Sequence, residues 1–386
     1  MRKIKYMLPA VILLLFFFFG CKQKGTETEN SSAPVTIIVG HVGHDHHTAL
    51  FVALDNAEQF SKESGIKIKT VEEFKFYEMY DKERKVADLQ IVKVGGGSKM
   101  PTALAQNVIE VGLGGVAPVL ASVDSGAPVK LISPLHYKGD MFVVKPDFQA
   151  KTWDEFVEIV KTSDNPIRIG YKSPDAVAKV IFEDSLRHEG IVFGGDLSVE
   201  GLQVQMVNVQ GGGKLNVALS GDLVDGYVGN NPFPSIAAEK NIGRIVCDLE
   251  ELPPGTFRNH PCCCIAANSK ISPEKSEAII DLLVLLLQAT ETINHDIDKA
   301  VASAVHWIGT SETVEKISIP TSGYSMETSQ QWYQTMTQWA KVMSDLEIFK
   351  GTLKELEPDN IDSAAYDFSL LEKAKEKLEK RRNENQ

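Results

Sequence analysis

Four histidines and one aspartate lie within seven residues, in the stretch Gly40-His41-Val42-Gly43-His44-Asp45-His46-His47 that follows an apolar run. Imidazole groups can bind a transition metal, or can hold an anion through hydrogen bonds. Adjacent histidines such as His46 and His47 point in different directions, so one ion cannot use all four. We expect His44, His46 and His47 to contact a small solute, because they lie nearest to the start of the next helix.

The same histidine stretch has two other interpretations. The first is a metal site, for which His41, His44 and His46 are the candidates, although we expect no bound metal and no cofactor. The second is a loop whose imidazoles only cap and solvate the chain.

A second concentration of reactive groups is His260-Pro261-Cys262-Cys263-Cys264, which holds three of the five cysteines. In an extended strand alternate side chains face opposite sides, which places Cys262 and Cys264 together and Cys263 opposite. Cysteine also serves as a small buried apolar residue. A disulfide to Cys247, metal binding and reactive-thiol chemistry are the remaining alternatives. The cysteines lack the spread-out pairs of a disulfide framework.

Short β-branched runs alternate with helical patterns, which predicts an α/β fold with mostly parallel sheets and helices on both faces. The pattern restarts near residue 141, so we expect two α/β units followed by a helical tail. The predicted strands are 35–40, 66–71, 90–94, 108–114, 129–133, 141–145, 167–170, 204–209, 223–228, 242–247 and 263–268. The predicted helices are 47–62, 99–107, 116–124, 153–161, 174–189, 213–220, 273–293, 296–306, 309–317, 328–347 and 363–382.

The two units predict two lobes connected by a hinge. Lobe 1 comprises 35–135 and 241–325, lobe 2 comprises 136–240, and the C-terminal helices of 326–386 pack on lobe 1. The chain then crosses between the lobes near 134–141 and again near 241. Two crossings make a hinge that suits closure around a solute.

Four loops rich in glycine, serine and proline follow predicted strands, two in each unit. In open α/β sheets, ligands bind beyond the carboxyl ends of the strands, where glycines let the backbone approach and helix N-termini favour anions. Each loop alone has a structural explanation, since turns between strands and helices use these residues, but two loops from each unit together favour a binding cleft. The loops are Gly95–Pro101, Gly114–Pro118, Tyr171–Asp175 and Gln210–Lys214.

Two of these regions carry a family resemblance. The stretch GGGSKMPTALAQNVIEVGLGGVAP (95–118) resembles the segment of nitrate/sulfonate/taurine-type substrate-binding proteins of ABC importers in which a helix reading ALxxGxID leads into a strand and a GxxP turn. Asn107 replaces the usual glycine, and Val108-Ile109-Glu110 replaces xID. The stretch VALSGDLVDGYVGNNPFPSIAAEK (217–240) is similar to the second such repeat, and the resemblance covers about 35–330.

This resemblance implies a periplasmic-binding-protein-like fold of type II, without catalysis. It also implies which loop residues contact the solute: Gly96, Gly97, Ser98, Lys99, Gly115, Val116, Ala117, Ser173, Pro174, Asp175, Tyr227, Gly229 and Asn230.

The cysteine run resembles a motif of the yeast-type thiamine pyrimidine synthases, which share this fold and use histidine and cysteine with iron. Those enzymes carry CCCFC, whereas Ile265-Ala266 interrupts the pattern here. The departure indicates common ancestry more than a common reaction.

The N-terminus resembles an export signal with a lipid attachment site. A basic start and an apolar run too short to span a bilayer comfortably precede Gly20-Cys21, so we expect 1–20 to be a removable signal and Cys21 to carry lipid. Phe18 and Phe19 depart from the usual lipoprotein pattern, and an ordinary signal with an incidental cysteine is the alternative. The polar stretch 21–34 reads as a flexible tether.

The net charge of −12 argues against nucleic-acid binding, and removal of 1–20 takes it to about −15. The apolar run Leu282–Leu287 is too short for a membrane span and predicts a buried helix segment. The last helix, EKAKEKLEKRR, reads as a solvated face.

These features predict a monomeric lipoprotein on the extracytoplasmic side of the cell membrane. It captures a small anionic or heterocyclic solute, of the sulfonate, nitrate, taurine or pyrimidine type, for an ABC permease and ATPase. A pyrimidine-synthase-like enzyme with iron and a metal-uptake receptor are the alternatives. The export signal counts against the enzyme, because its substrate is cytosolic. The sequence also lacks Ser-His-Asp spacing, HExxH and GxGxxG.

Overall fold

The computed structural model describes residues 33–96 and 98–385, and Pro34–Gln386 forms one compact unit. Eight strands form a first sheet in the order β14-β6-β13-β5-β1-β4-β3-β2. Among the strands that the structure describes in this sheet, only β1 makes parallel pairs, with β4 and β5. The sheet is therefore mixed, whereas the sequence predicted a mostly parallel sheet. Its strands are β1 (Val35–His41), β2 (Ile66–Glu72), β3 (Phe76–Asp81), β4 (Arg84–Lys93), β5 (Val111–Gly115), β6 (Val129–Lys138), β13 (Pro261–Asn268) and β14 (Ser322–Tyr324).

Six strands form a second sheet in the order β12-β7-β11-β8-β10-β9. Here β8, β9, β10 and β11 pair in parallel, and β7 and β12 add an antiparallel edge. The strands are β7 (Asp140–Val144), β8 (Ile167–Tyr171), β9 (Phe193–Gly194), β10 (Val204–Asn208), β11 (Gly226–Asn230) and β12 (Arg244–Asp248). Two α/β sheets confirm the predicted fold class.

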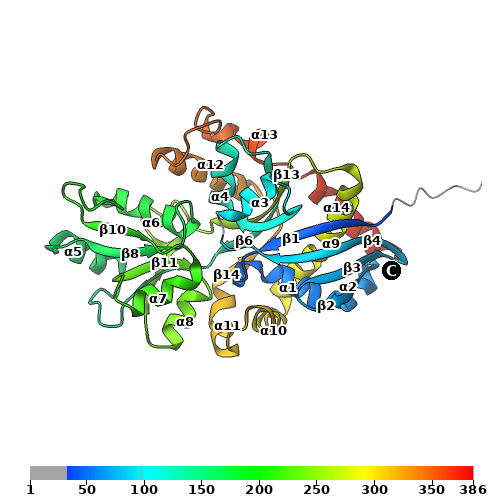
Figure 1. Cartoon of the computed structure of the whole chain (residues 1–386), viewed down its shortest axis with the longest axis horizontal. Helices are drawn as coiled ribbons and strands as arrows, with labels where there is room; N and C mark the ends of the chain where they lie inside the picture. Colours follow the sequence, from blue (N-terminus) through cyan, green and yellow to red (C-terminus); the bar gives the residue numbers. More distant parts are fainter. Residues whose placement is uncertain (1–32, 97, 386) are drawn as a thin grey trace, which may run out of the picture. The chain divides into compact units, whose positions relative to one another are not determined.

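Helices cover both sheets, and in Figure 1 α6 lies on one face of the second sheet while α7 and α8 lie on the other. The α-helices are α1 (Thr48–Asp55), α2 (Ala57–Ser64), α3 (Lys99–Ala105), α4 (Val116–Asp124), α5 (Trp153–Thr162), α6 (Val177–His188), α7 (Leu215–Ser220), α8 (Phe233–Glu239), α9 (Pro273–His295), α10 (Ile297–Ile308), α11 (Glu312–Ser318), α12 (Gln330–Asp345), α13 (Asp362–Ala365) and α14 (Ser369–Glu384). Short 3-10 turns are η1 (Asp45–His47), η2 (Gly212–Lys214), η3 (Leu249–Glu251), η4 (Ile319–Thr321) and η5 (Pro358–Asn360).

Helix α9 shows how the apolar sequence pattern builds the core. Leu282–Leu287 is buried, as predicted, and α9 packs against α1, β1 and β4 of the first sheet. Among residues 33–96 and 98–385, no helix is long and apolar enough to cross a bilayer.

Strand β3 and the first half of β4 were missing from the predicted strands, whereas the predicted strand 90–94 coincides with the second half of β4. Phe76–Asp81 and the first half of Arg84–Lys93 mix charged and aromatic residues, because this part of the sheet is only partly covered. Their alternation is therefore weaker than that of a buried strand.

The predicted boundary between the lobes needs correction at 241. Residues Arg244–Asp248 form β12, which pairs antiparallel with β7, so the stretch 241–248 belongs with the second sheet and not with lobe 1. Ile245 lies opposite Val143, and Gly243 lets this turn approach Val143 closely. Strand β12 thus pairs with the edge of β7 that β11 leaves free.

The chain passes between the sheets at two places. The first is Gly139, between β6 and β7, and the second is 249–260, between β12 and β13. The first crossing falls within the predicted range, and the second comes later than predicted.

The C-terminal helices do not contact the first sheet alone. Helix α14 packs on α9 and α2, and its Lys377 pairs with Asp81 at the end of β3 at 2.9 Å. Helix α12 contacts α4 and β13 but also α6 of the second sheet, where Arg187 pairs with Asp345 at 3.1 Å. The predicted signal (1–20), Cys21, most of the tether and Gly97 lie outside the described residues.

Candidate functional site: a lysine-lined pocket beside a buried histidine–cysteine cluster

A cavity of about 1050 Å³ is lined by loops from both sheets. Strands β1 and β4 end beside it in parallel register, with His41 opposite Lys93, and β8 and β10 do the same with Tyr171 opposite Asn208. The pocket therefore lies where parallel strands end, as open α/β sheets favour. The lining residues are Val42, Gly43, His44, Lys93, Val94, Gly95, Gly96, Ser98, Lys99, Lys172, Ser173, Pro174, Asn208, Gln210, Gly211, Gly212, Gly213, Lys214, Asn230, Pro232, Phe233, Ile236, Ile308, Gly309 and Thr310.

Two glycines at matching places give the pocket loops their shape. Gly96 and Gly211 both have φ near +135°, a conformation almost restricted to glycine. The amide of Gly211 donates to the carbonyl of Lys172 at 2.9 Å, which ties the loop after β10 to the loop after β8. The backbone thus fixes the position of Lys172.

The charged groups in the pocket lining are cationic. Four lysines line it: Lys93, Lys99, Lys172 and Lys214. Among the described lining residues none is a carboxylate, although the chain as a whole carries a net charge of −12. The Lys172 ammonium donates to the Asn230 amide oxygen, and burial lowers the pKa of His44 well below its ordinary value, so His44 is neutral. The arrangement favours an anion.

His41 belongs to the core and not to a metal site. Its ring packs edge-on against Phe51 and Trp307, with centroids 5.4 and 6.1 Å away. Burial, with help from His47 and Lys93, lowers the pKa of His41 to about 3. This placement argues against the candidate metal role of His41.

A second cavity shares Val42, His44, Lys172 and Ser173 with the first. Its lining also includes His46, Cys262 and Cys263, which belong to a buried cluster of histidine and cysteine side chains. His46 Nδ1 lies 3.3 Å from Cys262 Sγ and 3.7 Å from Cys263 Sγ, and the two sulfur atoms are 3.9 Å apart. The His136 ring stacks on His46 at 3.8 Å. One ligand atom from each of these four buried residues lies within 4.8 Å of the others.

The two neighbouring cysteines converge because β13 is irregular. Its pairing with β6 shifts register between Pro261 and Cys263 and again between Cys263 and Cys264. Such bulges re-aim side chains, so Cys262 and Cys263 share a site. Cys264 instead faces the carbonyl of Gly114 at 3.6 Å, which corrects the predicted alternation. Cys247 and Cys262–Cys264 are free thiols, so the alternative of a disulfide from Cys247 is not observed.

The cluster separates one thiolate from one thiol. Burial alone raises the pKa of Cys263, but the neighbouring side chains of Cys262, His136, His46 and His47 outweigh it and lower the pKa well below its ordinary value. Burial raises the pKa of Cys262, whose thiol donates to Asp140 Oδ2 at 3.1 Å. Cys263 is thus the nucleophilic and metal-binding form of the pair.

His136 is the least satisfied group of the cluster. Among the described residues neither of its ring nitrogens has a hydrogen-bond partner, and its exposed fraction is 0%. Burial lowers its pKa to about 3, so it carries a free lone pair. An unsatisfied buried polar group costs about 1–3 kcal/mol, which a bound partner would recover.

Apart from Gly97, which lies outside the described residues, the predicted contact residues fall into three groups. Of these residues, His44, Gly96, Ser98, Lys99, Ser173, Pro174 and Asn230 line the pocket, and His46 and Gly115 line the adjoining cavity. Outside both lie His47, Val116, Ala117, Asp175, Tyr227 and Gly229.

The packing of the last group explains why these residues lie outside the two cavities. Tyr227 is buried and its hydroxyl donates to Asn216 Oδ1 at 2.8 Å, while Gly229 abuts Leu215. Val116 and Ala117 are buried in α4, and Asp175 is half-buried. His47 is buried and its Nδ1 accepts from the Val42 amide at 3.0 Å.

Several residues were missing from the sequence-based set. Lys93 lies two residues before the predicted loop Gly95–Pro101, and Lys172 lies inside the predicted loop Tyr171–Asp175 but was not among the predicted contact residues. Their signal was their position at the ends of β4 and β8. The sequence indicated Cys262 and Cys263 as candidate reactive residues. Their proximity to His46, however, depends on the bulges of β13. His136 carried no sequence signal beyond its place near the first crossing.

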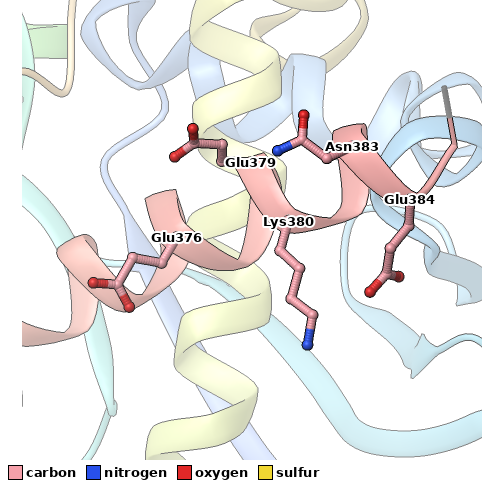
Figure 2. A pocket seen from close by; sticks show the side chains of 5 residues that line it. All are labelled: Glu376, Glu379, Lys380, Asn383 and Glu384. Carbon is pink, nitrogen blue, oxygen red and sulfur yellow. The ribbon is translucent and has the colours of Figure 1, made fainter.

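A further hollow runs along α14 and is lined by Glu376, Glu379, Lys380, Asn383 and Glu384. Figure 2 shows that these side chains all come from one helix and point to different sides of it. The three carboxylates and one lysine do not point toward a common centre, which agrees with the predicted solvated face of this helix.

Solved structures similar to this chain include proteins that are named for binding a ligand, nitrate or an alkanesulfonate. A ligand-binding component of an ABC-type import system from Staphylococcus aureus, with zinc bound, has a TM-score of 0.67 at 13% identity and covers 88% of this chain and 98% of its own. The nitrate-binding protein of Synechocystis has a TM-score of 0.68 at 11% identity, with 91% and 90% covered. The alkanesulfonate-binding protein of Xanthomonas axonopodis, bound to MOPS, has a TM-score of 0.59 at 14% identity, with 83% and 96% covered. At these identities the likeness shows the fold, and the predicted type II fold is confirmed.

Comparisons of sequence identify the family as well as the fold. An uncharacterized protein of Methanocaldococcus jannaschii is 35% identical over 150 residues, which are 39% of this chain and the whole of that protein. The model of the NMT1-like family matches residues 32–309. The chain therefore belongs to the NMT1-like family, with the fold of the periplasmic binding proteins of type II.

Proposed function

We propose that this protein is the solute-binding component of an ABC importer and that its solute is a small organic anion. The observation that carries the proposal is the pocket lining, in which loops from both sheets present four lysines and no described carboxylate. A cationic cleft with apolar walls concentrates anions from solution. The names of the similar solved structures, which bind nitrate or alkanesulfonates, agree with this chemistry.

The size and walls of the pocket favour an organic anion over nitrate. Phe233 and Ile236 line the pocket from α8, and Ile308 lines it from the end of α10. A volume near 1050 Å³ leaves room for a ring or a short chain as well as the anionic group. We therefore favour a sulfonate or a pyrimidine-like anion, with the acidic group near Lys93 and Lys172.

We also propose that the protein releases its solute chemically unchanged. The observation that favours the enzyme alternative is the His46–Cys262–Cys263 cluster, whose resemblance to an iron-using motif is broken at Ile265-Ala266. Mass spectrometry of the solute before binding and after release separates the two functions, because only an enzyme changes its mass.

Export and lipid attachment complete the proposal. Cys21 as the lipid carrier would hold the monomer on the extracytoplasmic face, beside its permease and ATPase. Metabolic labelling with a fatty-acid analogue tests this step, and the Cys21→Ser chain should lose the label.

The binding function itself is tested with matched pairs of anion and neutral analogue, titrated calorimetrically into the full chain in detergent. Ethanesulfonate is paired with ethanol, and uridine monophosphate with uridine. We expect at least one anion to bind about tenfold or more tightly than its neutral partner, since hydrogen bonds to charged groups are worth about 1.5–3 kcal/mol. Equal affinity within every pair would contradict the proposal.

A further inference from the structure

We propose that His46, His136, Cys262 and Cys263 form a closed binding site for one zinc-class metal ion. The four residues come from η1, β6 and β13, which are far apart in sequence, and all four are buried. Two imidazoles and two sulfurs are the donor set that tetrahedral zinc sites use. This inference is independent of the solute proposed above.

The spacing of the donor atoms fits a tetrahedron around one ion. Metal–sulfur and metal–nitrogen bonds of about 2.3 and 2.0 Å give tetrahedral edges of about 3.8 Å between sulfurs and about 3.5 Å between nitrogen and sulfur. The two sulfurs are 3.9 Å apart, and His46 Nδ1 lies 3.3 and 3.7 Å from them. His136 offers the fourth corner within 4.8 Å, which an imidazole movement of about 1 Å would close.

The surroundings orient His46 as metal ligands are oriented. Its Nε2 lies 3.2 Å from the carbonyl oxygen of Gly139, which can only accept, so the proton sits on Nε2. The lone pair of Nδ1 then faces the two sulfurs. A backbone carbonyl on the far nitrogen is the usual outer partner of a metal-binding histidine.

The charges of the site balance when an ion binds. Cysteine binds a metal ion as the thiolate, and metal binding releases the thiol protons to solvent. Two thiolates neutralise a divalent ion, so the ion and its four ligands together carry no net charge.

A site with four protein ligands has no open position for a solute. Such closed sites are structural, and their metal stabilises the fold. The ion would bridge η1 of the histidine loop to β6 and β13, beside the Gly139 crossing. This role differs from that of an uptake receptor, whose metal must leave.

The test is the metal content of the full chain purified in detergent from zinc-supplemented cells. We expect about one zinc per chain, and a zinc Kd at least about 100-fold weaker in His136→Ala and Cys263→Ser. Cys264→Ser is the matched control, because Cys264 lies next in the strand but faces Gly114, and it should keep its zinc. Cobalt substitution gives a second signal, since its sulfur charge-transfer band should weaken in Cys263→Ser.

A measurement on the unmodified chain keeps the test independent of variant folding. Added zinc should slow alkylation of Cys262 and Cys263 without changing that of half-buried Cys247. Equal alkylation with and without zinc, a Cys262–Cys263 disulfide in the reduced preparation, or full zinc retention in His136→Ala would each overturn the proposal. Loss of zinc with intact anion binding in His136→Ala supports it and leaves the solute-binding function standing.

Discussion

The lysine-lined pocket and the histidine–cysteine cluster share part of their walls but differ in how they are built. The pocket is made of loops that follow successive strands, and its lysines reach an open cavity of about 1050 Å³. The cluster joins side chains from three distant segments, and its four members are buried. The contrast teaches that a site for a passing anion and a site for a resident ion can lie side by side. The first requires exposed charge, and the second requires paired, buried donors.

Removal of pocket charge should have the largest effect. In Lys93→Met/Lys172→Met we expect the affinity for the best anion of the titrated pairs to fall about 100-fold or more, since each charged hydrogen bond is worth about 1.5–3 kcal/mol. Calorimetric titration measures the change, and zinc content should stay the same. Lys380→Met on the exposed face of α14 is the control (Figure 2). An unchanged Kd in the double variant would mean that the lysines only solubilise the cleft.

The second-largest effect should come from backbone strain introduced into the pocket loops. Gly211→Ala forces a side chain into φ near +135° and should lower the free energy of unfolding by about 1–3 kcal/mol. Gly213→Ala is the matched control two residues away, because a Cβ there meets open space at an ordinary φ. Urea unfolding of both variants gives the difference. Equal stability of the two variants would remove the argument that this loop is fixed by its glycine.

The pH dependence of stability should separate His41 from the cluster. Its pKa is about 3 in the folded chain against about 6.5 when unfolded, so the unfolded state takes up a proton first as pH falls. The stabilising effect of neutral His41 is complete above about pH 6.5 and is lost toward pH 3. Between pH 7 and 5 the unmodified chain should lose about 2 kcal/mol more than His41→Phe. Parallel pH profiles in urea unfolding would contradict this assignment.

The smallest expected effect is that of the cluster on solute binding. His136 lines neither cavity, so His136→Ala should change the Kd of the anion by less than about threefold while zinc is lost. Calorimetric titration and metal analysis of one preparation give both numbers. A large loss of anion affinity would show that the two regions act as one site.

The sequence predicted the pocket loops better than the cluster, for a physical reason. Loops at strand ends have local signals, so Gly96, Ser98 and Ser173 could be placed from strand order and turn residues alone. The cluster depends on register shifts in β13 and on the stacking of His136 on His46, which no local pattern encodes. The burial of Tyr227 has the same origin, because the phase of strand β11 determines that its side chain packs in the core.

The fold was predictable to a similar extent. Apolar runs such as Leu282–Leu287 located buried elements, whereas the β3–β4 hairpin and the partner of β12 depended on pairing between segments. The sheet edge that a strand joins is determined by tertiary packing and not by its local sequence. The boundary at 241 was wrong for that reason.

The most direct test of the central claim is the identity of the solute that stays with the full chain during purification. Native mass spectrometry of the chain, followed by analysis of the released compound, should find an organic anion of unchanged mass after repeated binding and release. The compound should be missing from Lys93→Met/Lys172→Met. A neutral or cationic compound, or equal retention by the double variant, would contradict the account.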